Sequence, residues 1–296
     1  MMGGAFASAI AAAFLALAYT SAWGTLIVAV PTREGFVVAA DSRVTLSDQA
    51  FYRRYVDGER KLHEVNSQPP IVFAITGALE VQATSSGVVS SVPQGSVGAD
   101  VLTQLRQAGT LRFATLIETA LRALANPILT DHMFDGICGT LVTRVNTVRE
   151  RLIGQEVLLG LFQSHGGVLR YAICQLRVHV PGVSVVKGPV KNYAAGSPGT
   201  FILLGQDKYT VTNVLTPGSA GHHFLPPAYH AVLDKLNRRQ AVREFDAQDG
   251  LLLGTSIISA AEQTSALVQT SDGGGIGGPI HAHIITDTKV FTLNVQ

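Results

Sequence analysis

Two five-residue apolar runs separated by a short charged turn constrain the fold of this chain more than any other feature. They lie within Leu26–Ala40, and the turn between them ends in glycine. Apolar runs joined by a short loop of this kind are typical of a β-hairpin. If Val30 pairs with Phe36, the antiparallel ladder places Asp41 opposite Thr25. The spacing therefore predicts a carboxylate beside a hydroxyl.

Thr25, at the start of the first strand, has two interpretations. On propensity alone it is an ordinary β-branched strand residue. The alternative is a nucleophile, because Gly24 leaves the preceding peptide carbonyl open to attack by the threonine hydroxyl or by a processing protease. Cleavage would give Thr25 an α-amine, whose pKa of about 7.7 to 8.0 lets it take the hydroxyl proton at neutral pH. One residue would then supply both the nucleophile and the base.

The stretch from Gly24 to Arg43 resembles the opening of the catalytic β-subunits of the proteasome, the N-terminal-nucleophile hydrolases that use threonine. It shares the Gly-Thr pair, the two strands around a Gly-ended turn and the Ala-Asp-Ser-Arg segment. The resemblance implies that Thr25 is the nucleophile and that Asp41 supports an active-site lysine. A direct count would place this lysine at Asp57, so we allow four inserted residues and assign it to Lys61. Such a lysine would stabilise the developing alkoxide and lower the pKa of the amine, while the carboxylate keeps the lysine charged. A solvated basic face is the alternative interpretation of this arginine-rich segment.

Three weaker positions complete the site that the resemblance implies. The backbone amide of Gly77, near the end of the third strand, is the expected oxyanion donor. Ser197, in a Gly-Ser-Pro-Gly segment that resembles the family's Gly-Ser-Gly loop, would help to hold the threonine amine, although a plain turn accounts for the segment equally well. Asp272 lies one residue before Gly273, where the family has an aspartate, and Ile276 stands where the family has a serine. Asp272 could serve only through an altered glycine turn.

The remaining pattern predicts an α+β protein, and the resemblance implies a four-layer αββα sandwich with the threonine at the open end between two sheets. Helical periodicity predicts one helix from Ala99 to Ala125 and another from an N-cap at about Asp246 to Val268. An insertion at about 206–245 precedes the second helix, and its three histidines fit solvated loop residues better than metal ligands. Strands are expected at 71–76, 139–145, 157–162, 168–176, 178–186 and 281–285.

Residues 1–24 have the composition of a leader that is removed. The apolar run Ile10–Tyr19 has the length of a signal-peptide core, and small residues stand three before and one before Thr25, as a signal peptidase requires. No Lys or Arg precedes residue 33, so the positive n-region is missing. A propeptide removed autocatalytically is the alternative, and a retained membrane anchor is a third. The first predicts export to the periplasm or exterior and the second a cytoplasmic protein, with 25–296 as one hydrolase domain in both.

Composition and cysteine content limit the partners, cross-links and cofactors that the chain is expected to have. A net charge of +1 gives no electrostatic reason to expect nucleic acid as a partner. Hydrophobic residues make up 47% and charged residues 15%, which predicts a well-filled core and a weakly charged surface. Cys138 and Cys174 can form at most one disulfide, and we interpret them as buried small hydrophobes. No Cys/His spacing suggests a metal site, and no cofactor is expected.

The sequence therefore favours a proteasome-like threonine endopeptidase acting on peptides or unfolded polypeptides. The resembled family packs helical layers between subunits into rings, so we expect a homo-oligomer of at least about six subunits whose sites face an interior. Two alternatives stay open. One is a catalytically inactive structural subunit of the same fold, which Gly273 and Ile276 favour. The other is an N-terminal-nucleophile amidase that acts on a small amide.

Overall fold

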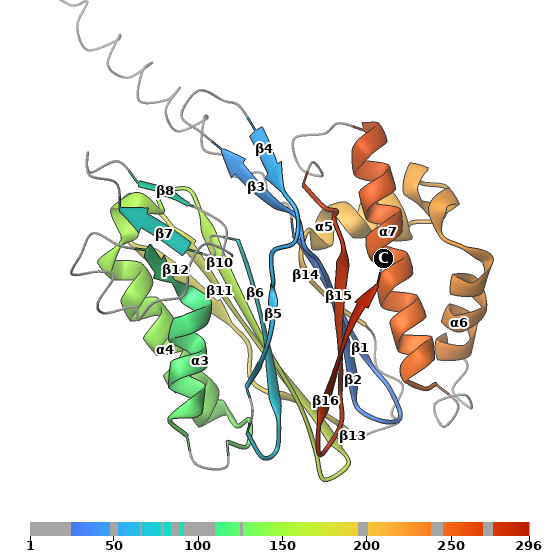
Figure 1. Cartoon of the computed structure of the whole chain (residues 1–296), viewed down its shortest axis with the longest axis horizontal. Coiled ribbons are helices and arrows are strands. Elements are labelled where there is room, and N and C mark those ends of the chain that lie inside the picture. Colours follow the sequence, from blue (N-terminus) through green and yellow to red (C-terminus); the bar gives the residue numbers. More distant parts are fainter. Residues whose placement is uncertain are drawn as a thin grey trace, which may run out of the picture.

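Two antiparallel sheets packed face to face form the centre of the molecule (Figure 1). The computed structural model describes residues 25–47, 53–65, 67–77, 80–83, 89–91, 110–124, 127–194, 201–237, 245–268 and 275–295. The first sheet has the order β14–β1–β2–β15–β16, formed by Ile202–Gly205, Leu26–Pro31, Phe36–Asp41, Ile280–Ile285 and Val290–Val295. The second has the order β12–β11–β10–β6–β5, formed by Val183–Lys187, Val168–Val178, Glu156–His165, Ile71–Gly77 and Leu62–Val65. Strand β13 (Lys191–Ala194) also pairs with β11.

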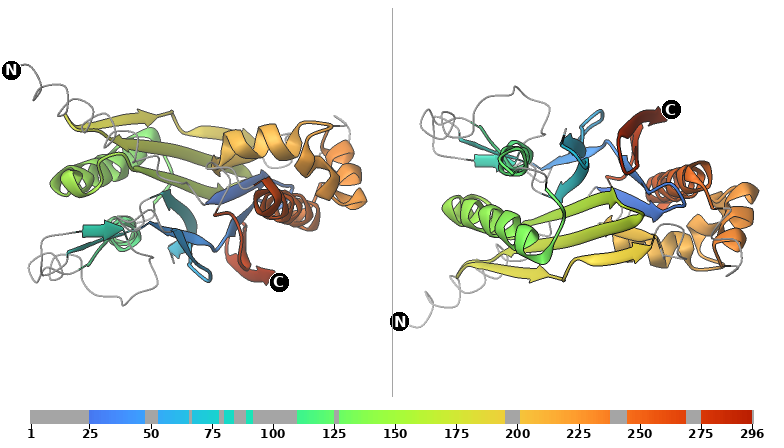
Figure 2. Two further views of the ribbon diagram at one scale, coloured as in Figure 1. Left: turned by 90° about the horizontal axis from the view of Figure 1, so that it is seen from above. Right: turned by 90° about the horizontal axis from the view of Figure 1, so that it is seen from below.

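Helices cover the outer face of each sheet. One apolar cluster joins α3 and α4 to the second sheet, another joins α7 to the first, and a third fills the space between the sheets. Figure 2 shows these two groups of helices on opposite sides of the strands. The helices are α3 (Phe113–Arg122), α4 (Asp131–Thr147), α5 (Asp207–Thr210), α6 (Pro227–Asn237) and α7 (Ala247–Val268), with short helical turns η1 (Arg149–Arg151), η2 (Val211–Leu215) and η3 (Ala220–Phe224).

The remaining strands form two small sheets beside the main pair. Their bounds are β3 (Val44–Ser47) with β4 (Arg53–Val56), and β8 (Val89–Ser91) with β7 (Glu80–Ala83) and β9 (Thr110–Arg112). Antiparallel sheets with helices segregated outside them make this an α+β protein, and the predicted fold class is confirmed at this level.

The hairpin of β1 and β2 forms as predicted, but its register differs by one residue. Pro31, and not its predecessor, pairs with Phe36. Continued to the other end of the hairpin, this ladder places Asp41 opposite Leu26 and not opposite Thr25. The predicted register is therefore wrong, although Asp41 still arrives at the start of β1.

A tightly bonded four-residue turn explains the shift. The backbone N–H and the hydroxyl of Thr32 both donate to the carbonyl of Gly35, at 2.7 and 3.0 Å. This turn ends the ladder at Pro31, which the spacing of apolar residues does not reveal. A Cβ atom at Gly35 would come within 1.8 Å of the carbonyl oxygen of Ile285, so glycine allows β2 to start close to the end of β15.

Residues 139–145 form part of helix α4, so the strand predicted there is wrong. The hydroxyl of Thr130 accepts a hydrogen bond from the N–H of Met133 at 3.3 Å and caps the helix. Gly136 and Gly139 weaken the helical pattern in the sequence. The buried side chains nevertheless recur at helical intervals, at Phe134, Ile137, Cys138, Leu141 and Val145.

Two further elements are shorter than predicted. The helix expected from Ala99 begins only at Phe113, because 110–112 pair with β7 as strand β9, and 99–109 lie outside the described residues. The strand expected at 178–186 is interrupted by a turn, since the N–H of His179 bonds to the carbonyl of Gly182 at 2.8 Å. Strand β12 therefore starts after this turn and folds back on β11.

The other predicted elements are confirmed. Strands β6, β10, β11 and β15 cover the predicted segments 71–76, 157–162, 168–176 and 281–285. Helix α7 begins after Asp246, whose carboxylate accepts the N–H groups of Gln248 and Asp249 at 2.9 and 3.0 Å, as expected of an N-cap. The segment predicted as an insertion is largely helical, with α5, η2, η3 and α6 lying beside α7.

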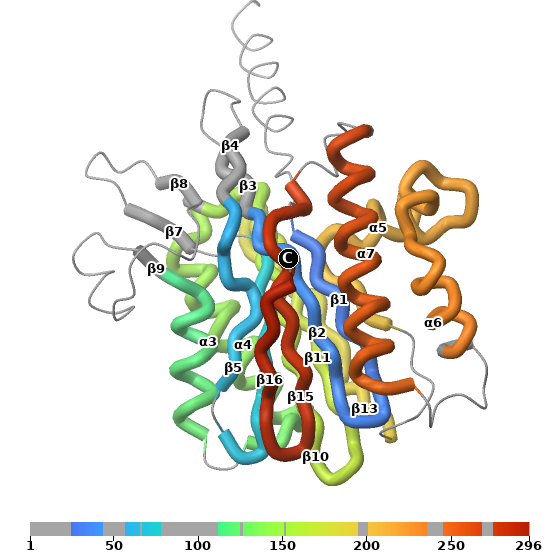
Figure 3. Tube along the Cα trace, turned by 45° about the vertical axis from the view of Figure 1, so that its right-hand side comes forward, coloured from blue at the N-terminus to red at the C-terminus, as the bar shows by residue number. Residues whose placement is uncertain are grey.

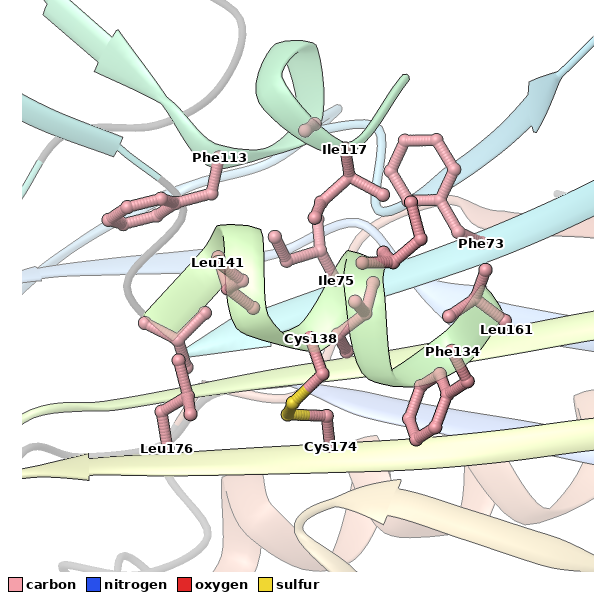
Figure 4. Close-up of a cluster of buried hydrophobic side chains, with 14 of the residues drawn as sticks. Phe73, Ile75, Phe113, Ile117, Phe134, Cys138, Leu141, Leu161, Cys174 and Leu176 are labelled. Atoms are coloured by element: carbon pink, nitrogen blue, oxygen red, sulfur yellow. A yellow bond between two sulfur atoms is a disulfide. The ribbon is translucent and has the colours of Figure 1, made fainter. Parts of the chain in front are cut away.

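Cys138 of α4 and Cys174 of β11 form a disulfide inside the apolar cluster (Figure 4). Both cysteines are buried as predicted, but their interpretation as unbonded hydrophobes is wrong. Because α4 packs on β11, residues 36 positions apart come within 6.3 Å between Cα atoms. The bond joins the helical layer covalently to the second sheet.

Candidate active site

An ion pair of Lys61 and Asp41 is buried where β2 ends and β5 begins. Nζ of Lys61 lies 2.9 Å from Oδ1 of Asp41, and neither side chain is exposed (0%). Nζ also donates to the carbonyl of Arg43 at 2.6 Å. Since Asp41 belongs to the first sheet and Lys61 leads into the second, this pair connects the two sheets at one end.

Backbone groups hold the carboxylate of Asp41 as well. Its Oδ1 accepts the N–H of Leu26 at 2.8 Å, and its Oδ2 accepts the N–H of Gly277 at 3.2 Å. Leu26 directly follows Thr25, so the carboxylate links the lysine to the start of β1. Hydrogen bonds to both oxygens fix the orientation of the carboxylate.

Burial is the main influence on the ionisation of this pair. It raises the pKa of Asp41 and lowers the pKa of Lys61, while the charge of each partner and the hydrogen bond between them oppose these shifts. Opposed shifts of this kind, caused by burial and a specific charged partner, are common at functional sites.

Thr25 lies at the start of β1 and is only 7% exposed. Its carbonyl accepts the N–H of Gln206 at 2.9 Å. Gly205 has a φ of +90°, and a Cβ atom there would come within 2.1 Å of the same carbonyl oxygen. Glycine therefore permits the close approach of β14 to the start of β1. No hydrogen bond joins the hydroxyl of Thr25 to Lys61 within the described residues.

Arg43 forms a second, more exposed charge network beside the buried pair. It binds Asp57 through hydrogen bonds of 2.7 and 3.1 Å and lies 3.6 Å from Glu262. The hydrogen bonds from the guanidinium lower the pKa of Asp57. A Cβ atom at Gly277 would come within 2.4 Å of Nη1 of Arg43, so the glycine lets the loop before β15 cross the end of β2.

Asp57 and Lys61 lie in different environments. Asp57, where a direct count would place the lysine, has a side chain that is 44% exposed and that binds Arg43. Lys61 instead reaches Asp41. The side chain of Arg60, the nearest basic neighbour, donates to a backbone carbonyl at 3.1 Å.

The structure places the other predicted site residues only in part. Gly77 ends β6 with a φ of +87°. Gly24, Ser197 and Asp272 lie outside the described residues, and their roles stay predictions. Ile276 is fully buried in the apolar cluster on the first sheet.

The residues that sequence reasoning missed are Gly205 and Gln206, which bring β14 against Thr25. Residues 201–204 read Phe-Ile-Leu-Leu immediately before Gly205, and an apolar run that ends in glycine is a strand signal. The resemblance instead selects Ser197, in the Gly-Ser-Pro-Gly segment a few residues earlier.

No protein-family model matches the chain, and a search of the curated proteins gave no match.

Among the described residues, no group of three or more His, Cys, Asp or Glu side chains could hold a metal ion. Across the same part of the chain, every helix is too short or too polar to cross a membrane.

Proposed function

We propose that this protein is a threonine hydrolase of the N-terminal-nucleophile class, similar to the proteasome β-subunits, that hydrolyses peptide bonds through Thr25 after removal of residues 1–24. The observation that carries the proposal is the fully buried Lys61–Asp41 pair, hydrogen-bonded to the backbone of the residue after Thr25. Burying two charges costs several kcal/mol per ion before their attraction is counted. A fold that keeps such a pair beside a threonine at the head of a strand is well suited to activate its hydroxyl.

In the proposed reaction, Oγ of Thr25 attacks the carbonyl carbon of the substrate. The α-amine takes the hydroxyl proton as the O–C bond forms, and it then passes this proton to the leaving nitrogen as the C–N bond breaks. Water hydrolyses the resulting ester, which releases the acid and restores the hydroxyl. Lys61 would stabilise the negative charge on Oγ, and the backbone N–H of Gly77 would donate to the oxyanion.

The arrangement of layers supports the finer assignment of the fold. Helices outside two stacked sheets, with the threonine at one end of a central strand, are what a four-layer αββα sandwich of this class requires. Ser197 and Asp272 belong to the proposal as groups that would help to hold the amine. The location follows the leader: export if residues 1–24 are a signal peptide, and the cytoplasm if they are a self-cleaved propeptide.

Thr25→Ala tests the proposal. The substitution removes the attacking hydroxyl and should abolish hydrolysis of peptide substrates, with an unchanged circular dichroism spectrum. Thr25→Ser, which keeps a hydroxyl, should retain measurable activity, and Thr140→Ala on the exposed face of α4 should behave as wild type. Equal activity in Thr25→Ala would refute the threonine mechanism. If wild type hydrolysed small amides but no peptides, the amidase alternative would replace the peptidase.

The proposal extends to assembly into a ring that encloses the sites and admits only unfolded polypeptides. Exposed apolar side chains at the edge strand β12 and the turn before it, Val180, Val185 and Val186, give a surface that self-association would cover. Light scattering coupled to size exclusion decides this point. A single species at or slightly below the 31.3 kDa of the chain, at micromolar concentration, would remove the ring from the proposal.

A further inference from the structure

Gln206 is the cross-strand neighbour of Thr25. Leu26 pairs with Gly205, so the next position outward joins Thr25 to Gln206, and the N–H of Gln206 donates to the carbonyl of Thr25 at 2.9 Å. The ladder ends here, because Gly205 has a φ of +90° and Gln206 is the N-cap residue of α5. The backbone hydrogen bond nevertheless holds Gln206 directly beside Thr25.

The backbone of Gln206 is fully bonded, but its side chain is not. Its carbonyl accepts the N–H and the hydroxyl of Thr210, at 3.0 and 2.6 Å. The side chain is buried, with 7% of the residue exposed, and Nε2 has no hydrogen-bond partner among the described residues. Leaving a buried amide unpaired costs free energy that a partner would recover.

Gln163 shows how the same side chain is treated where its role is structural. It is also buried, and its amide is paired on both sides. Its Nε2 donates to the carbonyl of Pro127, and its Oε1 accepts the N–H of Leu129, both at 2.8 Å. Two buried glutamines in one molecule thus differ in one respect, and the unpaired one stands beside the proposed nucleophile.

We propose that Gln206 is a positioning residue whose side-chain amide binds the α-amine of Thr25 once cleavage after Gly24 has created it. In the intact chain the nitrogen of Thr25 is a peptide nitrogen with one hydrogen. Nε2 of Gln206 has no hydrogen-bond partner among the described residues in this state. The released amine carries further hydrogens, and Oε1 can accept one of them. A half-turn of the terminal amide exchanges Oε1 and Nε2, so either atom can occupy the unpaired position. This inference rests on the proposed function.

The bond would have two consequences. It would orient the amine so that its lone pair faces the hydroxyl of Thr25. It would also stabilise the protonated amine and raise the pKa of the amine, because an acceptor favours the charged form.

Variants of Gln206 and Gln163 separate this role from a structural one. In the full chain carrying Thr25→Ala, which cannot process itself, Gln206→Met should leave the unfolding temperature unchanged or raise it, because it removes an unpaired polar group. In the processed enzyme Gln206→Met should lower kcat about 10- to 100-fold through misorientation. The acid limb of the pH profile of kcat/KM should move to lower pH in Gln206→Met and to higher pH in Gln206→Glu. The control Gln163→Met should lower the unfolding temperature of both forms without moving the acid limb.

Wild-type kcat and an unmoved acid limb in processed Gln206→Met would overturn the inference. A lower kcat with an unmoved acid limb would also overturn it, because the amide would then act on the substrate and not on the amine. Either result leaves the proposed function intact as long as wild type begins at Thr25 and Thr25→Ala is inactive. Activity in Thr25→Ala would instead refute the proposed function itself.

Discussion

Asp41 and Asp287 connect the stacked sheets at opposite ends, and the two carboxylates bind different kinds of partner. Asp287, in the turn between β15 and β16, binds the hydroxyl of Ser164 and the N–H of Gly167 beside the β10–β11 turn. Asp41 at the far end of β2 binds Lys61. Figure 3 shows the turns of the β1–β2 and β15–β16 hairpins together at one end of the molecule, away from the end of β2 that carries Asp41.

The pKa values of the two carboxylates are shifted in opposite directions. Burial raises the pKa of Asp287, but the hydrogen bonds from Ser164 and Gly167 outweigh it and leave the pKa below its ordinary value. Burial raises the pKa of Asp41 so strongly that the charge of Lys61 does not reverse the shift. The surroundings of Asp287 thus favour its charged form. The surroundings of Asp41 disfavour its charged form through desolvation, and such perturbed groups cluster at functional sites.

Removing the lysine should have the largest effect. Lys61→Met leaves a buried carboxylate without its counter-ion, so it should lower the free energy of unfolding by about 3–5 kcal/mol and reduce hydrolysis by orders of magnitude. Denaturant unfolding and peptide hydrolysis measure the two effects. Lys187→Met, which breaks an exposed pair with Asp135, is the matched control and should cost about 0–1 kcal/mol. Full activity in Lys61→Met would refute the role of the lysine. The variant Asp41→Asn removes the charge that pairs with Lys61, and it should also lower the rate of hydrolysis by orders of magnitude.

His283, in the middle of β15 between the two ends, should make the fold sensitive to acid. Burial first, and then the nearby Arg60, His63 and His281, lower the pKa of His283 from 6.5 to about 4. The folded state therefore binds fewer protons than the unfolded chain, and stability falls as pH drops from about 6.5 towards 4, by about 3 kcal/mol in total. His283→Gln should flatten this part of the curve of unfolding free energy against pH. The exposed control His223→Gln should keep the wild-type slope, and an equally steep curve in His283→Gln would contradict the assignment.

The smallest effect on stability and activity is expected from removing the carboxylate of Asp287. Asp287→Ala should lower the free energy of unfolding by about 1–2 kcal/mol at neutral pH and leave hydrolysis unchanged. Because the folded pKa is lowered, this contribution is present above the ordinary pKa of an aspartate and is lost as pH falls through the folded value. Urea unfolding of wild type and variant at several pH values checks both statements. A large loss of activity in Asp287→Ala would show that hydrolysis does not depend on the end with Asp41 alone.

Much of the central fold could be predicted because its strands are written as unbroken apolar runs. The hairpin of β1 and β2 and strands β6 and β10 are of this kind, and all are almost wholly buried. Helix α4 could not be predicted, since Gly136 and Gly139 break its pattern and its amphipathic face shows only after packing. The register of the first hairpin depends on two hydrogen bonds of Thr32, which no apolar pattern records.

The candidate site was predictable where it lies close in sequence to Thr25 and not elsewhere. The resemblance predicts that Asp41 supports Lys61, and the two side chains form an ion pair in the structure. Gln206 could not be identified as the neighbour of Thr25, because the pairing of β14 with β1 joins segments about 180 residues apart, and only the folded chain shows which segments meet.

The most direct test of the whole account is the intact mass and N-terminal sequence of the purified protein, measured together with its peptidase activity. We expect that active protein has lost residues 1–24 and begins with Thr25, and that the full-length chain is inactive. Hydrolysis by a chain that still carries residues 1–24 would refute the threonine mechanism, because such a chain has no amine at Thr25.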